Sequence, residues 1–217
     1  MKFRQVNKKT GKTETYQTDD LKRLLAYLDQ EFKRTNDIAL LAVKLNLYLG
    51  LRVGELVSLK WRDVVDLKHL QVVREEIKEP VRQDDKWVDV YRVVEHTKTH
   101  SDRFVPLVPA AIAILNYIRF KMASGASEDD FIFIRDGERL HARQINYVLE
   151  KACKKLEIPV KRSHKIRKTV ASLLHAGGVP LDSIREMLGH SNSNTTLGYI
   201  YDPLTEKETY ELIKKAL

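Results

Sequence analysis

The sequence predicts an α+β fold, in which a mostly helical domain carries a small three-stranded antiparallel sheet. Apolar residues recur at helical spacing on both sides of the segment 70–107, which is itself rich in valine and in aromatic residues that alternate with polar ones. Helices and strands are therefore segregated along the chain. Segregation favours α+β over a doubly wound α/β arrangement, in which the two kinds of element alternate.

The first part of the chain predicts helices after a polar lead-in. Residues 1–17 contain few large apolar groups, and we interpret them as a linker or flexible lead-in to a domain that spans residues 18–217. Four leucines between Leu21 and Leu28 lie at the i, i+3, i+4, i+7 spacing of an amphipathic helix. The segment 37–49 is apolar on most faces, which predicts a central helix.

A short helix is expected from Val53, after Gly50 has ended the central one. Three strands follow, with the sequences LQVVREEI, WVDVYRVVEH and RFVPL. The segment EPVRQDD is expected to connect the first two strands, and TKTHSD the second and third.

The rest of the chain predicts further helices. Gly177 and Gly178 provide a C-cap, and Pro180 opens the helix that follows. A short apolar run, FIFI, interrupts the helical pattern. The expected helices cover residues 109–123, 141–156, 163–176, 180–189, 194–200 and 205–216.

Composition excludes several classes of protein. The chain has one cysteine, Cys153, so an intrachain disulfide or a cysteine cluster that holds zinc is impossible. No apolar run is long enough to span a membrane, and the first residues lack the apolar core of a secretory signal, so we expect a cytoplasmic location. The net charge of +8 suits a polyanionic partner such as nucleic acid, although many basic proteins have no such partner.

Motifs for nucleotide or metal chemistry are missing from the sequence. It contains no GxxxxGK[ST] loop, no GxGxxG after a strand, no HExxH and no aspartate-rich cluster. We therefore expect no cofactor and no metal, and any reaction should depend on side chains alone.

Arg52 and Lys98 are the first candidate functional residues. Arg52 follows the central helix in GLRVGEL, where Leu51 and Val53 partly desolvate it, and its planar guanidinium suits a phosphate. It can also be a structural arginine that pairs with Glu55. Lys98 lies in the TKTHSD turn, where its ammonium can be aimed at a ligand or can simply be solvated.

Two histidines, a second arginine and a tyrosine complete the candidate set. His164 and Arg167 are three residues apart in SHKIRK, so they share a face near a helix N-terminus, which favours a phosphate. A basic helix surface would give the same pattern. His190 follows Gly189 at a helix end, and Tyr199 comes nine residues later. Taken alone, a tyrosine in such an apolar setting would be a core residue.

Taken together and in order, these residues resemble the active-site set of the tyrosine recombinases of the phage integrase family. GLRVGEL followed by LKWRDV resembles that family's first box, and HKIRKTVASLLHAGGVPLDSIREMLGHSNSNTTLGYIY resembles its second. The TKT that precedes a strand ending in VPL is also similar. The resemblance covers about residues 18–210 and implies the tyrosine recombinase catalytic fold.

The resemblance implies an enzyme that cleaves and rejoins DNA through a 3′-phosphotyrosyl intermediate. Tyr199 would be the nucleophile, and Tyr201 is the alternative nucleophile because family members vary in this spacing. His164 would accept or orient the proton of the tyrosine. Lys98 would be the general acid that protonates the leaving 5′-oxygen.

Other roles concern the charge of the phosphate. The resemblance implies that Arg52 and Arg167 neutralise its non-bridging oxygens from two sides, and that His190 donates to one of them. Glu55 would support Arg52 without reacting itself.

The family resemblance also implies partners. Double-stranded DNA would be the substrate, four identical chains would assemble on two duplexes, and the reaction would integrate or excise a phage or mobile element in a bacterial host. The last expected helix carries Leu212, Ile213 and Leu217 on one side, which can pack on its own domain or on a neighbouring copy. Full-length members carry an N-terminal DNA-clamping domain, so the sequence would be either an excised domain or a short natural form.

Three other functions stay open on the sequence alone. A type IB topoisomerase-like enzyme would use much the same residues but rejoin the same strand. A non-catalytic DNA-binding regulator could use the same scaffold. A basic globular protein could match the motifs by accident.

Overall fold

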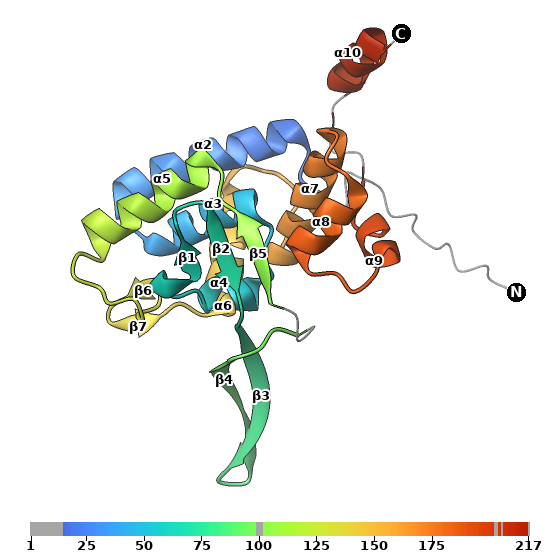
Figure 1. Cartoon of the computed structure of the whole chain (residues 1–217). Coiled ribbons are helices and arrows are strands. Elements are labelled where there is room, and N and C mark those ends of the chain that lie inside the picture. Colours follow the sequence, from blue (N-terminus) through green and yellow to red (C-terminus); the bar gives the residue numbers. More distant parts are fainter. Residues whose placement is uncertain (1–14, 99–101, 202–203, 205, 217) are drawn as a thin grey trace, which may run out of the picture.

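The computed structural model describes residues 15–98, 102–201, 204 and 206–216, and Figure 1 shows how their elements are arranged. The helices are α2 (Thr18–Thr35), α3 (Ile38–Leu49), α4 (Val53–Val57), α5 (Pro109–Tyr117), α6 (Ala142–Lys155), α7 (Ser163–Ala176), α8 (Leu181–Leu188), α9 (Ser193–Leu197) and α10 (Glu206–Ala216), with short helical segments η1 (Trp61–Asp63) and η2 (Ile118–Met122). The strands are β1 (Val64–Val65), β2 (His69–Val72), β3 (Glu75–Gln83), β4 (Lys86–Val94), β5 (Arg103–Pro106), β6 (Ile134–Arg135) and β7 (Glu138–Arg139).

Helix α3 lies at the centre of the domain, as its apolar sequence predicts. It contacts α2, α5, α6 and α7, and most of its side chains are buried. Asp37 caps its first turn by accepting a hydrogen bond from the backbone N–H of Ala39 (3.0 Å). Gly50 ends it in the left-handed conformation (φ 63°), which favours glycine. The backbone is therefore still buried where α3 ends, immediately before Arg52.

The small three-stranded antiparallel sheet is present, but it is not built from the three expected strands. Its order is β1-β2-β5, and Leu70 of β2 is paired with Val105 of β5 on the face that packs against the core. The expected strand LQVVREEI is divided between β2 and β3. Between them Arg74 turns inward, and its Nη1 donates to both carboxylate oxygens of Asp63 (2.6 and 2.8 Å).

The prediction that WVDVYRVVEH joins this sheet, and that EPVRQDD is a connection, was wrong. Strands β3 and β4 form a separate two-stranded hairpin that projects from the body in Figure 1. Its turn is only Asp84–Asp85, both at positive φ (44° and 62°), as a tight hairpin requires. Pro80 is tolerated within β3 because each strand of a two-stranded ribbon is an edge.

The C-terminal helices α7, α8 and α9 gather on one side of the body, and α10 extends away from it in Figure 1. Leu212 and Ile213 of α10 are about half exposed (48% and 54%), whereas Glu208 accepts a hydrogen bond from Thr18 at the start of α2 (2.5 Å). Leu217, the third apolar residue of the expected stripe, lies outside the described residues. None of the described helices combines the length and apolar character that a membrane span needs.

The last residues of the expected flexible lead-in are packed against the domain. Tyr16 is fully buried, and its hydroxyl donates to the backbone carbonyl of Lys161 (2.8 Å). Its backbone N–H donates to Oγ1 of Thr169 in α7 (2.8 Å). Packing against the domain therefore begins before α2, at Thr15 and Tyr16, while residues 1–14 of the expected lead-in lie outside the described residues.

Candidate active site

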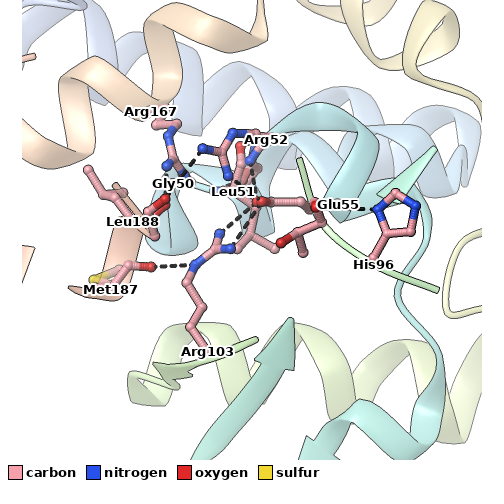
Figure 2. Close-up of polar contacts among 12 residues, drawn as sticks. Gly50, Leu51, Arg52, Glu55, His96, Arg103, Arg167, Met187 and Leu188 are labelled. Carbon is pink, nitrogen blue, oxygen red and sulfur yellow. Dashed lines mark hydrogen bonds and ion pairs between the residues drawn. The ribbon is translucent and has the colours of Figure 1, made fainter. Parts of the chain in front are cut away.

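Four segments meet at the candidate site: the connection from α3 to α4, strand β5, helix α7 and the connection from α8 to α9. Arg52 lies at the N-terminus of α4, and Glu55 lies one turn further along. Arg103 is the first residue of β5, and Arg167 lies in the second turn of α7. Figure 2 shows these side chains converging from their separate elements.

The carboxylate of Glu55 is the centre of this cluster. Glu55 is fully buried, and each of its oxygens accepts two hydrogen bonds. Oε1 accepts from Nη1 of Arg52 (2.7 Å) and Nη1 of Arg103 (3.0 Å), and Oε2 accepts from Nη2 of Arg103 (2.7 Å) and the backbone N–H of Arg52 (2.8 Å). Burial alone would raise the pKa of Glu55, but Arg103 and the other arginines hold that pKa below its ordinary value.

The C-terminal end of α8 fixes the three arginines. The last carbonyls of a helix have no partner within it and carry partial negative charge, so they attract cations. Here three successive carbonyls, those of residues 187–189, each accept from a different arginine. The pairs are Arg103 Nε with Met187 O (2.8 Å), Arg167 Nη2 with Leu188 O, and Arg52 Nη2 with Gly189 O (3.5 Å). These bonds to the end of α8 fix the positions of α4, β5 and α7 relative to one another.

Arg167 is among the largest fully buried side chains of the domain, at 1% exposure. Its Nη1 donates to the carbonyl of Gly50 (3.0 Å), but its Nε has no hydrogen-bond partner among the described residues. Burial lowers the pKa of Arg167 to about 10, with further lowering from Arg52 and Arg103 against the opposing effect of Glu55. The guanidinium is still cationic at neutral pH. The alternative that Arg167 belongs to a solvated basic surface is therefore wrong.

His190 is also buried, at 5% exposure, directly after the left-handed Gly189. Its Nδ1 lies 3.0 Å from Oγ1 of Thr196, and its Nε2 has no partner among the described residues. Burial, followed by the positive charges of Arg167 and the other arginines, lowers the pKa of His190 to about 4. The imidazole is consequently neutral at pH 7.

Tyr199 packs between the two candidate histidines. Its ring centroid lies 4.5 Å from that of His190 and 5.3 Å from that of His164, in edge-to-face geometry in both cases. The buried hydroxyl of Ser172 in α7 accepts from the backbone N–H of Tyr201 (2.9 Å). It shares its proton between the carbonyls of Lys168 (2.8 Å) and Tyr199 (3.2 Å). The segment that carries both tyrosines is thus held against α7.

Lys168 faces both tyrosines, with its Nζ 5.6 Å from the ring centroid of Tyr199 and 5.1 Å from that of Tyr201. Tyr199 contacts the candidate histidines, whereas the described ring contacts of Tyr201 involve Lys168 alone. This difference favours Tyr199 as the residue that belongs to the cluster.

Lys98 stands apart from the other candidates. It is exposed and follows β4, and no hydrogen bond or ion pair joins it to the other candidates in the described part of the chain. Residues 99–101 of the expected TKTHSD connection lie outside the described residues. The described contacts therefore unite Arg52, Glu55, Arg167, His190, Tyr199 and His164, and they do not include Lys98.

Arg103 is the site residue that sequence reasoning missed. Its position in RFVP, in phase with the buried Val105, was the available signal, because alternate residues of a strand face the same side. Arg103 also explains Gly189. A Cβ at Gly189 would lie 2.9 Å from Cδ of Arg103, and the backbone there has φ +64°.

The chain matches known proteins over nearly its whole length. The profile described as the phage integrase family matches residues 14–207. Tyrosine recombinase XerA of Thermococcus kodakarensis is 32% identical over 91% of this chain and 59% of its own length, and a probable integrase/recombinase of Methanocaldococcus jannaschii is 31% identical over 91% and 55%. The chain therefore spans little more than half of either relative. The Tn1549 transposon integrase, solved in complex with transposon right end DNA, superposes with a TM-score of 0.70 at 19% identity, covering 94% of this chain and 66% of that one.

Proposed function

Because the chain belongs to the phage integrase family, we propose that it cleaves and rejoins DNA at specific sites through a 3′-phosphotyrosyl intermediate, to integrate or excise a phage or mobile element. One observation carries this proposal. Two buried nitrogens, Nε of Arg167 and Nε2 of His190, have no partner among the described residues and belong to the cluster that holds Tyr199. Nε of Arg167 is a donor, and Nε2 of His190 is one in the tautomer that carries its proton there. Unpaired buried donors are costly, and an oxyanion is the acceptor that would satisfy both.

The proposed reaction exchanges one phosphoester for another. The hydroxyl of Tyr199 attacks the scissile phosphorus, the new bond joins its oxygen to phosphorus, and the bond from phosphorus to the 5′-oxygen breaks. His164 accepts the proton of the tyrosine, and Lys98 donates a proton to the leaving 5′-oxygen. A 5′-hydroxyl of a second strand reverses these steps, so the energy of the bond is conserved in the covalent intermediate.

The charged side chains of the cluster have complementary roles in this proposal. Arg52 and Arg167 neutralise the charge that develops on the non-bridging oxygens, and each such preorganised donor contributes several kcal/mol in sites of this kind. We assign His190 the tautomer in which Thr196 donates to Nδ1, so that the neutral imidazole donates to the phosphate through Nε2–H. Glu55 keeps Arg52 in place.

We further propose that the partners are double-stranded DNA and three other copies of the chain, in the cytoplasm. The net charge of +8 and the DNA bound in the Tn1549 integrase structure support the first partner. The exposed Leu212 and Ile213 of α10, which extends from the body in Figure 1, support contact with a neighbouring copy.

Covalent trapping tests the proposal. The substrate is a pool of nicked duplexes with randomised flanks, from which the short 5′-hydroxyl fragment is lost after cleavage, so that the adduct accumulates. Without added metal, we expect a denaturant-resistant adduct from the wild type and from Tyr201→Phe, and none from Tyr199→Phe. Absence of any wild-type adduct would contradict the proposed function. An adduct lost only in Tyr201→Phe would reassign the nucleophile.

A further inference from the structure

We propose that Arg103 is a positioning residue, whose guanidinium holds the carboxylate of Glu55 in the orientation from which Glu55 aims Arg52 at the phosphate. The inference rests on the proposed function, since the aim of Arg52 matters only if a phosphate binds there. It assigns a role in catalysis to a strand residue that does not itself face the substrate.

The main evidence for this role is that Arg52 and Arg103 bind the same carboxylate, that of Glu55. Each oxygen accepts one bond from Arg103 and one from Arg52, so the two arginines hold the same group from opposite sides. The fork of Arg103 contacts both oxygens (3.0 and 2.7 Å), which defines the plane of the carboxylate. If Arg103 were lost, the Glu55 side chain could rotate about its last torsion angle and carry Nη1 of Arg52 with it.

Arg103 is itself held rigidly and out of reach of substrate. Its Nε donates to the carbonyl of Met187 (2.8 Å), and its backbone is paired in the sheet opposite Val72. Its stem fills the space that Gly189 leaves by lacking a Cβ. Its side chain is 6% exposed, whereas that of Arg52 is 24% exposed. Arg52 can therefore meet a phosphate, and Arg103 acts through Glu55.

Single-turnover cleavage of the nicked pool tests this role in Arg103→Met and Arg103→Lys, with Arg74→Met as the matched control. Arg74 is buried to a similar degree, with 4% of its side chain exposed against 6% for Arg103, and it contacts Asp63 through Nη1 at 2.6 and 2.8 Å but lies outside the cluster. We expect both Arg103 variants to cleave at least about tenfold more slowly at saturating enzyme, with the DNA dissociation constant changed less than about twofold. Arg74→Met should keep the wild-type rate.

A second substrate separates positioning from a general structural defect. When the scissile phosphate is replaced by an uncharged methylphosphonate, the transition state carries less negative charge, so an arginine that neutralises this charge contributes less to the rate. A misplaced Arg52 should then reduce the cleavage rate of the methylphosphonate substrate less than that of the phosphate substrate, whereas a damaged fold should reduce both rates equally. We expect the ratio of the phosphate rate to the methylphosphonate rate to fall about tenfold in the Arg103 variants, as in Arg52→Met.

The possible outcomes are distinct. An unchanged ratio in Arg103→Met and Arg103→Lys, with an active wild type, overturns the role of Arg103 and leaves the proposed function standing. No adduct from the wild type overturns the proposed function. If Arg103→Met does not fold, Arg103→Lys decides alone, because it keeps the charge and loses only the fork.

Discussion

At the scale of single residues, the candidate site is defined by an excess of buried positive charge. Arg52, Arg103 and Arg167 surround the one carboxylate of Glu55, and the partial negative charge at the end of α8 offsets only part of the remainder. The lowered pKa values of Arg167 and His190 are consequences of burial and of this excess. A bound phosphate would neutralise this excess of positive charge, which is the physical reason why an anion fits here.

Lys98 provides a prediction about the leaving group. Lys98→Met should slow cleavage of ordinary DNA by about 10²-fold or more, because the 5′-oxygen would leave as an alkoxide. Replacing that oxygen by sulfur should restore the rate, because a thiol has a pKa of about 8.5 and needs no proton in order to leave. Lys98→Arg keeps the charge but is a poor acid, so it should behave like Lys98→Met. Equal slowing on both substrates would remove Lys98 from the role of general acid.

His190 provides a prediction about stability and pH. Its pKa is about 4 in the folded protein against 6.5 ordinarily, so between these values the unfolded chain binds more protons. His190 therefore makes its full contribution to the free energy of unfolding above pH 6.5. As the pH falls from 6.5 towards 4, this contribution decreases by at most about 1.4 kcal/mol per pH unit. Urea unfolding at pH 7 and pH 5 should therefore show a smaller acid loss in His190→Asn than in the wild type. The same loss in both proteins would contradict a neutral, buried His190.

At the scale of elements, the β3–β4 hairpin should be dispensable for folding. The core described here contains no side chain between Val72 and Val105, and an isolated two-stranded hairpin contributes little stability of its own. Replacing residues 79–90 by Asn-Gly joins Lys78 to its cross-strand partner Tyr91 through a tight turn. We expect the free energy of unfolding to change by less than about 0.5 kcal/mol. A loss of several kcal/mol in urea unfolding would show that the hairpin supports the core.

The sequence predicted the elements better than their pairing. The helical periodicity of α2 and the apolar run of α3 placed those helices correctly, because each pattern is local. The membership of the sheet depends on distant contacts. β1 has two residues and no detectable pattern, and the break between β2 and β3 exists because Arg74 pairs with Asp63.

The same limit applies to the candidate site. Ordered motifs pointed to Arg52, Arg167, His190 and Tyr199, and the structure places these side chains in one cluster. Arg103 has no motif of its own beyond its alternation with Val105. Its importance arises from Glu55 and the end of α8, which are far away in sequence.

At the scale of the whole molecule, the net charge of +8 predicts how DNA binding depends on salt. Each phosphate neutralised by the protein releases counterions, so the affinity should fall steeply as salt rises. Fluorescence anisotropy with the nicked duplex pool should show the dissociation constant rising about tenfold or more between about 50 and 200 mM salt. An affinity that does not change over this range would argue against DNA phosphates as the main contacts.

The central claim is that Tyr199 becomes covalently joined to DNA, and peptide mass spectrometry of the trapped adduct tests it most directly. After digestion by protease and nuclease, we predict that the peptide containing Tyr199 and Tyr201 carries a nucleotide through its 3′-phosphate, and that fragmentation places it on Tyr199. The ring contacts of Tyr199 with His190 and His164 are the basis of that prediction. A nucleotide on Tyr201, or on a residue outside this segment, would contradict the account.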